Sequence, residues 1–122
     1  MTTKEAVTFH KLDLNLLAPT IQQAENGFVK PDFLKDCTVH IAISSDIQLG
    51  DSVSPSLNIE GVGRFSRTPI VVTEEHLVEG IVWQLPAYNI VATPGAAVAA
   101  DYSVQKSDGS DSKSPVGRYK VK

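Results

Sequence analysis

The sequence predicts an all-β protein, an antiparallel β-sandwich of about seven strands. Three observations in the C-terminal half carry this prediction. Ile81–Pro86 is an apolar run that a proline closes, and Val98–Val104 alternates apolar and polar residues with a period of two. Ser107–Ser110 has the composition of a tight turn, and Val116–Lys122 alternates again. Short alternating strands separated by turn residues are typical of two antiparallel sheets packed face to face.

The N-terminal third is less regular. Residues 1–11 show no period and are expected to form a flexible arm. Leu12–Leu16 alternates and predicts a first edge strand, and the proline in Leu17–Ile21 also suits an edge. Glu25–Phe28 contains an Asn-Gly turn, and Lys30–Leu34 predicts a single helical turn with a proline near its start.

The middle of the chain contains clearer strands. Thr38–Ile43 alternates strongly, and Val53–Glu60 alternates around Pro55, which favours a bulge or an edge position. A short strand follows at 69–73. Glu74–Gly80 predicts one helical turn between a threonine cap and a glycine. The segment 87–95 is expected to cross from one sheet to the other.

Length and composition indicate one domain with its own core. The chain has 122 residues, of which 42% are hydrophobic, and this suffices for a stable core without crosslinks. The single Cys37 closes no internal disulfide, excludes a thiolate zinc site and fits a reducing compartment. The N-terminus lacks the apolar run of a secretory signal, and no segment approaches the roughly 20 apolar residues of a membrane span. We expect a cytoplasmic protein, or one exported without a classical signal peptide.

Short turn and strand motifs follow one another in a recognisable order. They resemble those of the bacterial immunoglobulin-like domains found in large surface and adhesin-type proteins, over roughly residues 17–122. The resemblance implies an immunoglobulin-like β-sandwich over residues 12–122 and assigns no catalytic residue. The motifs are Leu17-Ala18-Pro19-Thr20-Ile21 with Asn26-Gly27, Gly50-Asp51, Leu85-Pro86 with Ile90 and Gly95, Tyr102-Ser103-Val104, Asp108-Gly109, and Ser114-Pro115.

Charge is distributed unevenly along the chain. The formal net charge is −3, but the segment from Val104 onward holds five Lys or Arg against two Asp, leaving six Lys or Arg against twelve Asp or Glu before it. Basic residues on a closing edge strand discourage edge-to-edge pairing, so we expect a monomer or a weak dimer. A patch for an acidic partner is the alternative. An excess of three positive charges is too small for a nucleic-acid footprint.

No catalytic or metal-binding constellation stands out. His10, His40 and His76 fall in the arm, a strand and a helical turn, so neither a catalytic triad nor a zinc site is indicated. Asp108–Ser112 alternates oxygen ligands that suit calcium but lacks a downstream Glu and also spells a hairpin turn. Gly61-Val62-Gly63 lacks the Lys-Ser/Thr of a phosphate loop. We therefore expect no enzyme activity and no cofactor.

Trp83 and Tyr102 have the strand parity of core residues, and the Tyr102 hydroxyl is expected to bond near an end of the sandwich. An exposed Trp83 would instead provide a platform for carbohydrate. Cys37 is expected to be inert, because Lys35 next to it is balanced by Asp36.

The best candidate surface is a glycine-rich, basic segment that we interpret as a loop over residues 61–67. Its binding residues would be Arg64, Phe65 and Arg67, because interfaces favour both arginine and aromatic side chains. The sequence thus predicts a non-catalytic interaction or structural module that binds a protein partner or acts as a spacer in a larger assembly. The alternative is a small carbohydrate-binding protein that uses Phe65, Tyr88 or Trp83 for stacking.

Overall fold

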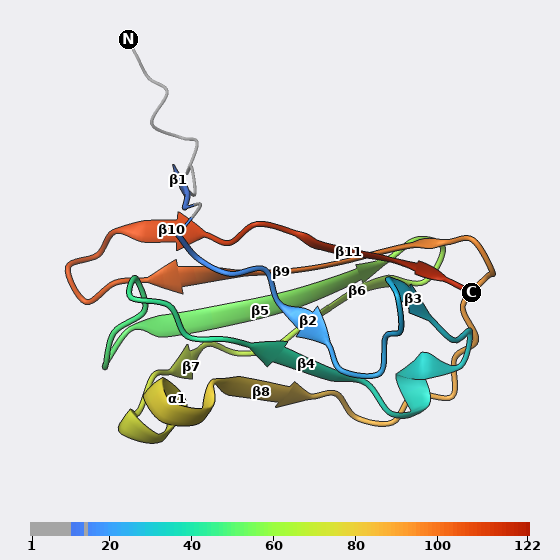
Figure 1. Ribbon diagram of the computed structural model, residues 1–122, viewed down its shortest axis with the longest axis horizontal. Helices are drawn as coiled ribbons and strands as arrows, with labels where there is room; N and C mark the ends of the chain where they lie inside the picture. The colour runs from blue at the N-terminus through green and yellow to red at the C-terminus, as the bar shows by residue number, and fades with distance from the viewer. Residues whose placement is uncertain (1–10, 14) are drawn as a thin grey trace, which may run out of the picture.

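The structure, a computed structural model, describes residues 11–13 and 15–122, which form two β-sheets (Figure 1). The arm expected over residues 1–11 lies outside the described residues except for Lys11. A large sheet contains eight strands and a small sheet contains three. The strands are β1 (Lys11–Leu12), β2 (Thr20–Ile21), β3 (Phe28–Val29), β4 (Thr38–Ile41), β5 (Ser52–Ile59), β6 (Gly63–Ser66), β7 (Ile70–Val71), β8 (Ile81–Gln84), β9 (Ala97–Gln105), β10 (Asp111–Lys113) and β11 (Gly117–Val121).

The predicted all-β sandwich is confirmed. The small sheet has the order β2-β4-β8, and the large sheet is built on the long central pair β5 and β9, which Figure 1 shows side by side. Strands β6 and β7 both pair with β5, and strands β10 and β11 both pair with β9. If β6–β7 and β10–β11 are each counted as one interrupted strand, and the short strands β1 and β3 are set aside, seven main strands result. The two-residue strands β1 and β3 add parallel pairs at the edge of the large sheet, which the alternation did not predict.

The first expected strand is shorter than its alternation suggests. Among the described residues of this segment, Lys11–Leu12 belongs to a strand, which pairs with β10. The carboxylate of Asp13 accepts a hydrogen bond from the Asn15 backbone amide at 2.9 Å, and its carbonyl accepts one from the amide of Leu16. This local turn ends the strand and turns Leu16 into the core.

Pro55 occupies a central strand, so the expected edge position is wrong. The strand β5 runs without interruption and pairs Pro55 with Tyr102 of β9. On its other side, β6 pairs with residues 56–59 and β7 with residues 52–53, and neither contacts Pro55 in register. The missing N–H of proline therefore costs no ladder bond on that side. The irregularity lies in the neighbouring strand, at Arg67, Thr68 and Pro69 between β6 and β7.

Both predicted helical turns are present. The 3-10 turn η2 spans Phe33–Lys35. The helix α1 (Glu74–Glu79) starts at Thr73, whose side chain accepts from the amide of His76, and ends at Gly80 with a φ of 84°. This positive φ favours glycine, and a Cβ at Gly80 would also meet the ring of His40. The helix carries the chain from the large sheet to β8 of the small sheet.

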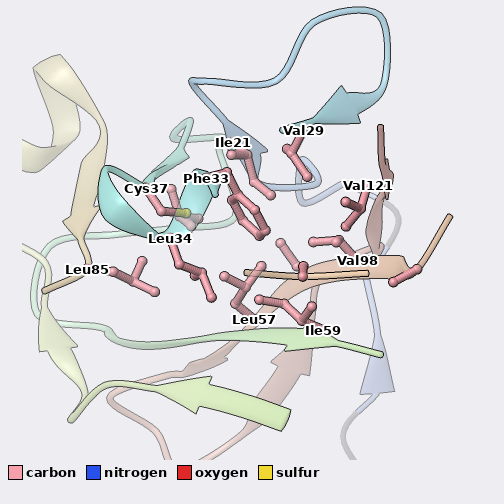
Figure 2. Close-up of a cluster of buried hydrophobic side chains, with 14 of the residues drawn as sticks. Ile21, Val29, Phe33, Leu34, Cys37, Leu57, Ile59, Leu85, Val98 and Val121 are labelled. Carbon is pink, nitrogen blue, oxygen red and sulfur yellow. The ribbon is translucent and has the colours of Figure 1, made fainter. Parts of the chain in front are cut away.

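The core lies between the two sheets. Figure 2 shows apolar side chains from both sheets and from η2 converging in one cluster. Trp83 and Leu57 belong to this cluster, and Tyr102 belongs to a second one around Ile41 and Val53. Trp83 is 5% exposed and Tyr102 is 1% exposed, so the predicted burial of both rings is confirmed. The Tyr102 hydroxyl donates to the carbonyl of Leu17 at 2.7 Å.

Candidate functional site

A groove opens where the free edges of the two sheets face each other. The strand β6 pairs only with β5, and β8 pairs only with β4, so each leaves one edge without a strand partner among the described residues. The groove has a volume of about 570 Å³. We call it the edge groove. Its lining residues are Arg64, Phe65, Ser66, Arg67, Trp83, Gln84, Leu85, Pro86 and Tyr88.

The three predicted binding residues all line this groove, but only Arg67 lies outside a strand. Gly63–Ser66 forms strand β6 and contains Arg64 and Phe65, and residues 60–62 form the hairpin turn, where the amide of Val62 donates to the carbonyl of Ile59. The loop prediction for residues 63–66 is therefore wrong. The glycine-rich, basic composition suggested a loop, whereas pairing with β5 stabilises the strand.

Phe65 points between the sheets. It pairs with the fully buried Leu57 and packs against the core while remaining partly exposed. Its ring lies 5.0 Å from that of Tyr88, with an interplanar angle of 47°, which is a favourable tilted geometry. The pair joins the edge of the large sheet to the segment that follows β8. Strand alternation places Arg64 and Ser66 on the opposite face of β6, so Arg64 lies at the rim of the groove.

The charge of the edge groove is one-sided. Arg64 and Arg67 are exposed, and neither forms an ion pair with any described residue. The lining includes no Asp or Glu, although the chain holds fourteen. Gln84 has its hydrogen-bonding capacity in use, since its amide contacts Asp36 and the Cys37 carbonyl, and its oxygen accepts from Thr38 at 2.6 Å. The two guanidinium groups are thus the charged groups of this groove, and both lack an ion partner in the described chain.

The opposite wall of the groove comes from β8 and the segment that follows it. Trp83, Leu85 and Pro86 line it together with Gln84, and Trp83 and Leu85 contribute little accessible surface. The burial of Trp83 removes it as a stacking platform, whereas Tyr88 is partly exposed. The sequence indicated residues from both sides of this groove without predicting that the two sides form one groove. That they face each other depends on the crossing of the chain between the sheets, which no local pattern encodes.

The other chemistry-bearing residues have structural partners. A ring nitrogen of His40 lies 3.3 Å from the Glu79 carbonyl, and Nδ1 of His76 accepts from the Thr73 amide at 3.0 Å. His10 lies outside the described residues. Asp108 accepts from the amide and hydroxyl of Ser110, and these bonds lower the pKa of the Asp108 carboxyl. The segment 108–112 thus contains a hydrogen-bonded hairpin turn.

Cys37 lies in the interior, as expected of an inert thiol. Its side chain is fully buried, and burial, followed by the nearby charge of Asp36, raises the pKa of Cys37 to about 12. The reactive form of a cysteine is the thiolate. At neutral pH this thiol therefore stays protonated and shielded.

Within residues 11–13 and 15–122, no group of three or more His, Cys, Asp or Glu is placed to hold a metal ion. In the same part of the chain, no helix is long and apolar enough to cross a membrane.

The comparisons with known proteins find no relative. No protein-family model matches this chain. No curated protein matches it, and no solved structure matches it.

Proposed function

We propose that this protein is a non-catalytic, immunoglobulin-like interaction module that binds a protein partner through the edge groove. The observation that carries the proposal is the edge groove itself. It combines a half-exposed aromatic pair, Phe65 and Tyr88, with two arginines that have no ion partner among the described residues. Tyrosine and arginine are over-represented among residues that dominate binding energy at protein interfaces.

The order of the strands supports an immunoglobulin-like module. In the seven-strand form of that fold, the first, second, fourth and fifth strands form one sheet, and the third, sixth and seventh strands form the other. Here β2, β4 and β8 form the small sheet, while β5, β9 and the interrupted strand β10–β11 lie in the large sheet. The fourth strand, β6–β7, differs from that pattern, because it pairs with β5 in the large sheet. The fold commonly presents recognition surfaces, but the function is argued from the groove because a fold alone does not determine function.

A peptide-display selection tests this proposal. A random peptide library is selected on the wild-type protein, and the enriched peptides are then measured against two matched variants. The groove variant is R64E/R67E, and the control R118E/K120E makes the same change in net charge on β11. Binding that is lost in the groove variant and retained in the control supports the proposal. Enriched peptides that bind both variants equally well would contradict it.

A carbohydrate ligand is the second candidate, and one observation favours it. Tyr88 is partly exposed beside two arginines, an arrangement that suits stacking on a sugar ring with hydrogen bonds to its hydroxyls. A glycan array measures this directly. Reproducible, Tyr88-dependent sugar binding at sub-millimolar affinity would replace the protein-binding proposal. If neither peptides nor glycans bind, the role of a spacer within an assembly is favoured.

A further inference from the structure

We infer that the edge groove receives an extended, acidic segment of a partner protein, which adds to the free edge of β6 as a further strand. This inference rests on the proposed function and specifies the partner's chemistry. In strand addition, main-chain hydrogen bonds supply affinity, and alternate side chains supply specificity. Both components have a counterpart in the groove.

The backbone of β6 supplies the main-chain component. Its four residues pair with β5 on one side only, so alternate N–H and C=O groups point away from the sheet. The strand is roughly 13 Å long at the usual rise per residue. The outward edge therefore suits a segment of about four residues, with flanking residues that reach Arg67.

The side chains of β6 define the pattern of the bound segment. A residue opposite Phe65 points between the sheets, toward Tyr88 and the apolar wall at Leu85 and Pro86. A residue opposite Arg64 or Ser66 points to the other face, where the guanidinium of Arg64 has no ion partner in the described chain. The fitting segment thus alternates acidic residues with apolar or aromatic ones.

The other free edge bordering the groove suits such a segment less well. The strand β8 follows directly on α1, which carries Glu74, Glu75 and Glu79. It also continues into Pro86, which has no N–H to donate. An acidic segment would meet like charges near the start of β8 and lose a donor after its end. The chemistry therefore favours β6.

A designed peptide tests the inference. The probe is the fluorescein-labelled peptide TEVEYET, which alternates Glu with apolar and aromatic residues, and fluorescence anisotropy measures its Kd. We expect R64E/R67E to weaken binding at least about tenfold, whereas R118E/K120E changes it less than about twofold. Raising NaCl from 50 to 500 mM is expected to weaken binding to the wild type as well. Thermal unfolding verifies that both variants are folded.

N-methylated peptides separate strand addition from simple charge attraction. Two versions of the probe carry N-methyl groups on alternate sets of amides, so that only one version blocks the amides facing β6. We expect one version to lose at least about tenfold in affinity and the other to bind almost as well as the parent peptide. Equal binding of both versions would overturn strand addition but leave the proposed function intact.

A lack of peptide binding would also test the inference. If the wild type binds neither TEVEYET nor any acidic peptide from the display selection, the acidic-segment inference is wrong. Neutral peptides whose binding depends on Arg64 and Arg67 would still support the proposed function. If no selected peptide depends on the groove for binding, both the acidic-segment inference and the proposed function are wrong.

Discussion

At the scale of single residues, Cys37 links burial to pH dependence. Burial raises its pKa from 9.0 to about 12, so the folded protein keeps a proton that the unfolded chain releases above pH 9. An acid with a raised folded-state pKa contributes stability below its unfolded pKa and loses that contribution as pH rises. The free energy of unfolding should therefore fall between about pH 9 and 12, by up to about 1.4 kcal/mol per pH unit from this thiol.

Two measurements examine this expectation for Cys37. Ellman's reagent at pH 8 should label the native protein very slowly and the urea-unfolded protein completely. Denaturant titrations at pH 8 and pH 10.5 should reveal a smaller loss of stability in C37A than in the wild type. Tyr102, whose pKa burial raises to about 12, titrates in both proteins, so the difference between them isolates the thiol. Rapid native labelling would show that the thiol is accessible.

Trp83 is the residue whose truncation should cost most in the small sheet. Its ring belongs to the main core cluster and is 5% exposed, whereas the neighbouring Val82 is 51% exposed on the outer face. We expect Trp83→Ala to lower the free energy of unfolding by about 3–5 kcal/mol. The control Val82→Ala should change it by less than about 1 kcal/mol. A small effect of the Trp83 substitution would indicate an accessible ring and strengthen the carbohydrate candidate.

At the scale of elements, alternation predicted the strands that carry most of the core. Strands β4 and β9 follow their patterns closely, because each has one face buried against the opposite sheet. The strand β6 escaped prediction because its Gly-Arg-Phe-Ser sequence has little intrinsic strand preference and is held by β5. The strand β10, with the sequence Asp-Ser-Lys, escaped for the same reason and is held by β9.

The candidate site was predictable only in part. Arg64, Phe65 and Arg67 were recognisable by residue type, since interfaces favour arginine and aromatic side chains. Their opposite wall at Leu85, Pro86 and Tyr88 lies in the segment after β8 and depends on the crossing of the chain from the large sheet to the small one. Local patterns carry no information on which edges meet, so the groove required the tertiary structure.

An ion pair fastens the turn before β5 to the end of β9. Asp51 is almost fully buried, accepts from the Gln48 amide at 2.8 Å, and lies 2.7 Å from Nζ of Lys106, which also contacts the Asp46 carbonyl. Lys106→Met would leave a buried carboxylate without its cation. We expect a loss of about 3 kcal/mol, the lower end for a broken buried pair, because Lys106 is partly exposed.

The more exposed pair between Lys113 and Asp101 provides the control for this prediction. Lys113→Met should cost less than about 1 kcal/mol, since its charges are better solvated. Chemical denaturation of both variants gives the comparison. Equal losses would mean that the Asp51 pair contributes no more than a surface ion pair.

At the scale of the whole molecule, the free edges determine how copies of the protein meet. The closing strand β11 has the predicted alternation, with Val121 buried and Arg118 and Lys120 exposed. Its outer edge is partly covered, because β3 pairs with Lys120 and Val121 and the Pro19 carbonyl lies close to Gly117. On the other side of the large sheet, β6 and β7 pair only with β5 among the described residues, and β6 carries Arg64. The role of discouraging self-association therefore passes from the basic residues of β11 to Arg64 and Arg67.

The arginines at the edge of β6 are expected to keep the protein monomeric. In the wild type, two copies that approach edge to edge at β6 bring four guanidinium groups together, and like charges at an edge oppose strand pairing. We expect a monomer in light scattering at micromolar concentration. The variant R64S/R67S should associate more strongly, whereas R118S/K120S/K122S should remain monomeric because β3 still covers β11. If only the β11 variant associates, the basic residues of the closing strand, and not Arg64 and Arg67, prevent self-association. A tight wild-type oligomer would show that neither edge repels its copies and that one of them is buried in an interface.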